Sequence, residues 1–437
     1  MINQILKGGL AAFIIATGIN CSSGGSQQNR KLANEILKDS SFLLVDSMGR
    51  TILSRGLNAG SGYSQVWARD MNTFIETACE VVNKEDLRGA ILVFFGLQQS
   101  NGEMIDGYVL KGEFDWDDPD QYFSDAAPAH VGFKNTVETD QETSLIQIVG
   151  KYIRKTGDKS ILREQVAGKT VYTRMTEMID YLMREKYNKE YGLLTGALTA
   201  DWGDVQADKE NAVDITENSI CTIDAYDNAM FAIALDFMAE MSEEEKDCTK
   251  WQQLRKEIAG NTRKYLWDDR LNKIIPHVYP GKRPDWGDFD ESLMHYHGGT
   301  AVAIEAGLLE HDEIEIVNTQ MLENVRLSGM PSIGLTLYPP YPDGYFPGGM
   351  GQPYVYQNGG DWTWFGGRMI QQLIANGYVA EAYEEVRPMM ERVIKNKGFY
   401  EWYGKGGVPS GSGHFKGSAG VLCKAIQMFN EWADKNK

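Results

Sequence analysis

The feature that most constrains the fold of this chain is a helical hydrophobic period that recurs along most of its length. Apolar residues at helical spacing begin near residue 29 and continue to residue 436, while the alternation typical of strands is scarce. We expect helices over residues 29–37, 71–82, 86–99, 142–156, 171–186, 225–241, 248–266, 299–306, 312–324, 366–375, 379–395 and 417–436. They form pairs at intervals of roughly 50 to 70 residues. Such helical hairpins predict an all-α protein, an (α/α)6 barrel of six hairpins.

Two other helical architectures compete with this prediction. A solenoid would show a fixed repeat length, which these pairs lack, and an irregular helical bundle is the second alternative. No linker interrupts the pattern, so we predict one domain over residues 31–437. Between the pairs run long loops rich in Trp, Gly, Asp and Pro, and binding residues concentrate in loops on a rigid scaffold.

The first residues have the pattern of an export signal. Lys7 precedes an apolar run over residues 10–16, which is too short to span a bilayer permanently. Cys21 follows, so residues 1–21 resemble a bacterial lipoprotein signal, with residues 22–30 as a flexible tether. We predict export to the cell envelope of a Gram-negative bacterium, with membrane contact only through a lipid at Cys21. Plain secretion is the alternative.

Charge and composition exclude several function classes. The net charge is -18 and the pI about 4.9, which argues against nucleic acid or an anionic membrane as partner and fits a neutral ligand such as a carbohydrate. The five cysteines show no CxxC spacing and the six histidines no HExxH pattern. We therefore expect neither a metal site nor another cofactor.

Two loop segments place charged groups beside expected helix starts. Trp67, Arg69 and Asp70 combine a stacking ring with an Arg-Asp pair that can bind vicinal hydroxyls, so all three are candidate substrate-binding residues. The structural alternative is a salt bridge at a helix start, with Asp70 as the cap. Asp140 is a further candidate, and capping of helix 142–156 is its alternative role.

Two other segments supply carboxylates flanked by aromatic rings. Asp201 and Asp204 lie on either side of Trp202, and Glu401 is followed by Trp402. Glycoside hydrolysis needs a protonated carboxyl that donates to the leaving oxygen and an ionised one that activates water. Burial beside rings raises a carboxyl pKa, and rings also stack on sugars. The structural alternatives are a polar turn for the first segment and a helix-capping loop for the second.

A fourth segment combines amide, acid and indole groups. Asn358, Asp361, Trp362 and Trp364 precede an expected helix and are typical of a sugar-binding wall. The structural alternative is a turn whose rings pack under that helix.

Taken in order, these segments resemble the six-hairpin glycosidases, a superfamily that includes glucoamylases, debranching glucosidases, trehalases, processing glucosidases and alkaline invertases. The likeness covers about residues 45–430. It implies an (α/α)6 barrel with Asp204 as general acid, Glu401 as general base, and Arg69 and Asp70 on the non-reducing sugar. Asp201 is the alternative acid.

We therefore expect an inverting, exo-acting glycoside hydrolase. An inverting phosphorylase is the first alternative, because Lys405, Ser410, Ser412, His414 and Lys416 follow Glu401 and suit phosphate. A non-catalytic glycan-binding lipoprotein would need only the aromatic wall. A polysaccharide lyase would favour basic groups, which the net charge of -18 opposes.

Overall fold

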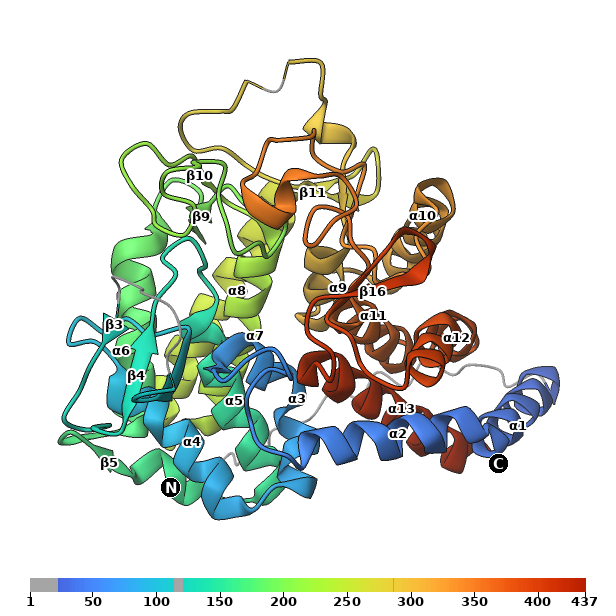
Figure 1. The fold of residues 1–437 in the computed structure, drawn as a ribbon, viewed down its shortest axis with the longest axis horizontal. Coiled ribbons are helices and arrows are strands. Elements are labelled where there is room, and N and C mark those ends of the chain that lie inside the picture. The colour runs from blue at the N-terminus through green and yellow to red at the C-terminus, as the bar shows by residue number, and fades with distance from the viewer. Residues whose placement is uncertain (1–22, 114–120, 286) are drawn as a thin grey trace, which may run out of the picture.

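The helices of the protein alternate along the chain between an outer and an inner ring (Figure 1). The computed structural model describes residues 23–113, 121–285 and 287–437, so the expected signal and Cys21 lie outside the described residues. The inner helices are α3 (Ala68–Val81), α5 (Gln141–Thr156), α7 (Ala225–Met241), α9 (His297–Glu305), α11 (Thr363–Ala375) and α13 (Lys416–Asn436). Each packs against the next, and α13 packs against α3. The ring is closed, which confirms the predicted (α/α)6 barrel.

The outer helices connect consecutive inner ones. They are α2 (Ser40–Leu53), α4 (Lys84–Leu97), α6 (Val171–Tyr181), α8 (Glu245–Leu266), α10 (His311–Ser328) and α12 (Val379–Asn396). Helix α1 (Ser23–Lys38) packs against α13. None of the helices in the described part of the chain is both long and apolar enough to span a membrane.

Burial explains which helices lie inside. Helix α7 is apolar around most of its circumference and is buried along nearly all of it, whereas α8 buries a single stripe that includes Trp251 and Ile258. Close approach also requires glycine. A Cβ on Gly150 of α5 would lie 2.0 Å from the ring of Phe237 on α7. The missing side chain therefore lets these two inner helices touch.

Every predicted helix is present, most with ends shifted by a few residues, and three differences are larger. Helix α2 was not predicted. Residues 23–30, expected as a flexible tether, form the first turns of α1. Residues 182–186, expected as the end of one helix, form a π-helical turn after α6.

Strands are short and confined to the loops. One antiparallel sheet has the order β1-β2-β4-β3, formed by β1 (Val66–Trp67), β2 (Gly107–Leu110), β4 (His130–Phe133) and β3 (Gln121–Tyr122), with Trp67 opposite Gly107. The remaining strands pair as ribbons: β5 (Gln165–Val166) with β6 (Lys169–Thr170), β7 (Tyr187–Asn188) with β8 (Leu193–Leu194), β9 (Gly196–Ala197) with β10 (Cys221–Thr222), β11 (Trp267–Asp268) with β12 (Lys273–Ile274), β13 (His295–Tyr296) with β14 (Leu337–Tyr338), and β15 (Trp402–Gly404) with β16 (Val408–Ser410).

Candidate active site

A cavity of about 520 Å³ lies where the inner helices begin. This volume is within the range of roughly 300–1,000 Å³ that is usual for small-ligand sites. Its walls come from the β-sheet and from the loops before α3, α5, α7, α11 and α13. The lining residues are Ala59, Tyr63, Trp67, Arg69, Asp70, Asp106, Phe133, Lys134, Asn135, Glu138, Gln141, Trp202, Asp204, Val213, Asp214, Tyr356, Gln357, Trp362, Trp364, Glu401 and Phe415. Carboxylates and aromatic rings dominate this set.

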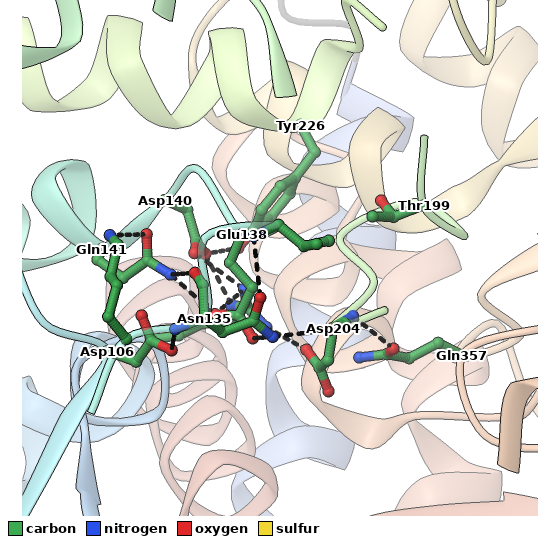
Figure 2. A network of polar contacts seen from close by, with 12 residues as sticks. Asp106, Asn135, Glu138, Asp140, Gln141, Thr199, Asp204, Tyr226 and Gln357 are labelled. Carbon is green, nitrogen blue, oxygen red and sulfur yellow. Dashed lines mark hydrogen bonds and ion pairs between the residues drawn. The ribbon is translucent and has the colours of Figure 1, made fainter. Parts of the chain in front are cut away.

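Asp204 lines the cavity and is held by hydrogen bonds to four residues. Its Oδ1 accepts a hydrogen bond from Arg69 Nη1 at 2.7 Å, and its Oδ2 accepts one from the Tyr356 hydroxyl at 3.0 Å. Its backbone N–H donates to Gln357 Oε1 at 3.0 Å, and its carbonyl accepts from Asn135 Nδ2 at 2.7 Å (Figure 2). The carboxylate is 29% exposed, so a ligand in the cavity can reach it.

Glu401 lines the same cavity from the loop before α13. Its Oε2 accepts a hydrogen bond from the backbone N–H of Ser412 at 2.9 Å, and the Tyr63 hydroxyl lies 3.1 Å from both carboxylate oxygens. Burial raises the pKa of Glu401, the hydrogen bonds from Ser412 and Tyr63 oppose this rise, and the charge of Asp204 adds to it. A base whose proton affinity is raised in this way is suited to accept a proton from water.

Arg69 joins three carboxylates through one guanidinium. Asp140 accepts two hydrogen bonds from it, at 2.7 and 2.9 Å, and Glu138 Oε2 lies 2.7 Å from its Nη2. Asp204 is the third partner. Bidentate pairing of this kind fixes the guanidinium plane, so Arg69 is a rigid part of the cavity wall.

Asp70 lines the cavity in the first turn of α3. Burial raises the pKa of Asp70 to about 7; the charge of Arg69 opposes the rise, and the carboxylates of Glu401, Asp204 and Asp140 add to it. Trp67 precedes the helix in the N-cap position, so Asp70 is not its cap. The carboxyl group of Asp70 therefore belongs to the cavity wall and not to the cap of α3.

Four predicted indole rings lie in the cavity wall: Trp67, Trp202, Trp362 and Trp364. Trp202 packs edge-on to Trp362, with centroids 5.4 Å apart, and tilts against Trp364 at 5.5 Å. Trp202, Trp362 and Trp364 are each only 4% exposed. These rings therefore belong to the hydrophobic core or pack against it, and they also line the cavity.

Two predicted acidic residues lie behind the wall. Asp140 is buried and holds Arg69 and the Tyr226 hydroxyl, the latter at 2.6 Å; it occupies the N-cap position of α5 without a side-chain capping bond. Asp201 is buried, and its oxygens accept from the backbone N–H of Gly299 at 3.0 and 3.1 Å. Neither lines the cavity, so both depart from the expected contact with substrate.

Three further candidates also lie away from the cavity lining. Asn358 is buried and exchanges hydrogen bonds with the backbone of Tyr341. Asp361 is buried, and its Oδ1 lies 2.8 Å from Nη1 of Arg392. This ion pair offsets the cost that an unpaired charge would have in the interior. Trp402 is half-buried and packs edge-on to Tyr356. These groups shape the loops that carry the site.

Several lining residues were not selected from the sequence. Tyr63 and Tyr356 place their hydroxyls on the two carboxylates, and Glu138 pairs with Arg69. Their position in the same loop segments as Arg69, Asp140 and Asn358 was the available signal. Their pairing partners are remote in sequence, so the roles are visible only in three dimensions.

Solved structures support the fold. A mannosylglycerate hydrolase of family GH63 from Thermus thermophilus, solved with Tris and D-glycerate, matches with a TM-score of 0.61 and 13% identity, covering 87% of this chain and 99% of its own. A rhamnosidase from Klebsiella oxytoca with rhamnose bound matches with a TM-score of 0.57 and 12% identity, covering 89% of this chain and 64% of its own. At such identities the likeness concerns the fold. A search of curated proteins found no match.

The family comparison covers more than half of the chain. Residues 65–335 match the bacterial alpha-L-rhamnosidase 6 hairpin glycosidase domain. This region holds Arg69, Asp70 and Asp204, whereas Glu401 lies beyond it. The protein is a glycoside hydrolase with the six-hairpin fold, and it belongs to the family of bacterial α-L-rhamnosidase six-hairpin glycosidase domains.

Proposed function

We propose that the protein is an inverting, exo-acting glycoside hydrolase in which Asp204 is the general acid and Glu401 the general base. The observation that carries this proposal is that both carboxylates line one aromatic-walled cavity, each with a tyrosine hydroxyl on it.

Glu401 suits the role of base because the groups that contact it donate hydrogen bonds. The Ser412 N–H and the Tyr63 hydroxyl both stabilise the ionised form. They also orient the carboxylate, so a water molecule beside it can be activated without a change of rotamer. The raised pKa strengthens the base.

Asp204 suits the role of acid because one of its oxygens is fixed and the other faces a group that can exchange hydrogen-bond roles. Arg69 holds Oδ1. Tyr356 meets Oδ2 through a hydroxyl, which can accept as well as donate. When Oδ2 is protonated, it can donate to the leaving oxygen of the substrate and then return to its hydrogen bond with Tyr356.

We propose inversion at the anomeric carbon because a base that activates water needs room for that water between its carboxylate and the sugar. Inverting enzymes separate their two carboxyl groups by roughly 6.5–9.5 Å, and retaining enzymes by about 5–5.5 Å. We propose the wider spacing for Asp204 and Glu401. Exo action is supported by Asp106 and Lys134, which line the cavity and are each only 6% exposed. Buried polar groups of this kind can close one end of the cavity, and a closed end suits the terminal sugar of a glycan.

The comparisons direct the search for substrate. The family name and the Klebsiella structure point to α-L-rhamnosides, and the Thermus structures point to mannosides and glucosides. The test is incubation with the p-nitrophenyl α-L-rhamnoside, α-D-mannoside and α-D-glucoside and with matching disaccharides, with and without phosphate. Release of sugar without phosphate supports the proposal, and release of sugar phosphate only in its presence contradicts it.

The phosphorylase alternative loses its support at the cavity. Lys405, Ser410, Ser412, His414 and Lys416 are all absent from the cavity lining. Ser412 instead uses its backbone N–H to hold Glu401. A non-catalytic glycan-binding protein would not need two carboxylates held by tyrosines beside the aromatic wall.

Export to the cell envelope with a lipid at Cys21 is proposed from the sequence alone. Mass spectrometry of the N-terminal peptide from membranes tests it, since an acylated Cys21 is expected and an unmodified residue contradicts it.

A further inference from the structure

Val213 lines the cavity and is nevertheless exposed to solvent. Its exposed fraction is 44%, whereas every other described residue of the cavity lining is buried or half-buried. It belongs to none of the buried hydrophobic clusters of residues 23–113, 121–285 and 287–437. The most exposed residue of a cavity lining marks the place where the cavity opens to solvent. Val213 therefore lies at the mouth, where its apolar side chain leaves water only when a ligand covers it.

The backbone around Val213 is fixed by hydrogen bonds. Its carbonyl accepts from the backbone N–H groups of Thr136 and Val137, at 3.1 and 3.3 Å. Two residues further on, the N–H of Ile215 donates to Thr136 Oγ1 at 2.8 Å. The main chain therefore holds the valine at the mouth without core packing of its side chain. A side chain presented in this way costs little to order when a ligand binds.

The same short segment also holds the proposed acid. Asn135, which directly precedes Thr136, donates from Nδ2 to the Asp204 carbonyl at 2.7 Å. Because consecutive Cα atoms are only about 3.8 Å apart, Asp204 and Val213 lie on the same side of the cavity. The acid of a glycosidase stands beside the leaving oxygen. Val213 therefore lies on the side of the mouth through which the leaving group extends.

The charges around the cavity restrict which leaving groups fit. Acids outnumber cations among the described lining residues, with Asp70, Asp106, Glu138, Asp204, Asp214 and Glu401 against Arg69 and Lys134. Arg69 already pairs with three carboxylates. The ammonium of Lys134 donates to Gln141 Oε1 at 3.1 Å and lies 3.7 Å from Glu142. Since both cations are engaged, an anionic leaving group would meet like charge in this cavity.

We propose that Val213 is a specificity-determining residue of the leaving-group subsite, and that this subsite takes a neutral leaving group with an apolar face, either a sugar ring or an aryl group. The C–H groups on one face of a pyranose can pack on the valine, as can an aromatic ring, and each methylene buried in this way is worth about fourfold in affinity. This inference rests on the proposed role of Asp204, because that role decides which side of the cavity receives the leaving group.

The test compares a disaccharide with the glycosyl fluoride of the same sugar and anomeric configuration, for whichever sugar the enzyme releases. Fluoride is a single atom and is too small to reach the mouth. Val213→Ala removes two methyl groups, so kcat/KM should fall about tenfold for the disaccharide and for the p-nitrophenyl glycoside, and should stay within about twofold for the fluoride. Val213→Thr keeps the shape and replaces one methyl group by a hydroxyl, so its loss on the disaccharide should be about fourfold.

Two further variants and one further substrate make the test specific. Val213→Ile keeps an apolar side chain and should keep the wild-type ratio of kcat/KM between disaccharide and fluoride. Val408→Ala is the matched control, because Val408 is also exposed, at 59%, and lies outside the cavity lining. It should leave both substrates unchanged. A disaccharide whose leaving sugar is a uronic acid should be cleaved at least about tenfold more slowly than its neutral counterpart, because like charges a few ångströms apart repel.

The outcomes separate this inference from the proposed function. In Val213→Ala, an equal fall in kcat/KM for the disaccharide and the fluoride, or no fall for either, overturns the contact with the leaving group. Cleavage of the uronic acid disaccharide as fast as the neutral one overturns the neutral subsite. If Asp204→Asn reduces cleavage of the disaccharide and the p-nitrophenyl glycoside equally, the proposed acid itself is wrong, and that result needs no Val213 variant.

Discussion

The hydroxyl of Tyr356 donates to Asp204 Oδ2 at 3.0 Å, from a backbone in the left-handed region with a φ of 51°. A non-glycine residue rarely adopts this conformation, which costs about 1–3 kcal/mol and clusters at functional sites. Asp201, with a φ of 58°, has the same unusual backbone three residues before Asp204. The two loops that meet at Asp204 are therefore both held in strained conformations beside the cavity.

Asp204→Asn should reduce cleavage most for substrates with poor leaving groups. Asparagine cannot protonate the leaving oxygen, which an alkoxide needs and a nitrophenolate does not. General acid catalysis contributes typically about 100-fold to 10,000-fold, so the loss for a disaccharide should approach that range and the loss for its p-nitrophenyl analogue should be smaller. Steady-state kinetics on both substrates measures the difference. Asp201→Asn is the control, and leaving-group dependence in that variant alone would reverse the assignment.

Glu401→Gln should nearly abolish hydrolysis while ligand binding survives. The amide keeps the shape of the side chain but cannot take a proton from water, and removal of a general base costs about 100-fold to 10,000-fold. Calorimetric titration with the product sugar checks that binding is retained. Turnover within a factor of about two of wild type would exclude Glu401 as the base.

Gly411→Ala should impair catalysis by displacing Glu401. Gly411 has a φ of 69°, and an added Cβ would lie 2.5 Å from Glu401 Oε2. Gly407→Ala is the matched control, because Gly407 has a φ of 72° and nothing within 4 Å of the added carbon. Both variants should lose about 1–2 kcal/mol of stability from the left-handed backbone, but only Gly411→Ala should lose most of its kcat. Equal kcat values in the two folded variants would contradict this reading.

Asp201 should make the free energy of unfolding depend on pH. Burial raises the pKa of Asp201 to about 8, although backbone hydrogen bonds from Gly299 and Gly298 oppose the rise. Between the ordinary value of 3.8 and about 8, the folded chain then holds a proton that the unfolded chain has released. The contribution of Asp201 to stability therefore falls as the pH rises through this interval. Urea denaturation between pH 4 and 8 should show a shallower decline for Asp201→Asn than for wild type, whereas parallel curves would count against the shifted pKa.

The helices could largely be predicted because their apolar period is strong. Helix α7 begins and ends at the predicted residues, 225 and 241, since nearly all of it is buried. Helix α2 was missed because Ser40, Ser41 and Gly49 weaken its pattern and Leu43 is 75% exposed. Packing of α2 against α13, from the far end of the chain, stabilises it instead.

The site could be predicted less completely than the fold. Asp201 and Asp204 are equivalent in sequence around Trp202, and their separation depends on how the loop turns at the left-handed Asp201. Tyr63 contacts Glu401, which lies 338 residues away in the chain, and Tyr356 contacts Asp204, which lies 152 residues away. Contacts of that range have no local signal, which is why the tyrosines were not selected.

The stereochemistry of the first product tests the central claim most directly. Proton NMR, recorded during the first minutes of cleavage of whichever p-nitrophenyl glycoside is turned over, resolves the two anomers before they equilibrate. Inversion at the anomeric carbon is the predicted result, because Glu401 activates water on the face opposite to the group that Asp204 protonates. Release of the sugar with the configuration of the substrate would mean that a carboxylate attacks the sugar directly, and the assignment of Glu401 as a base acting on water would be wrong.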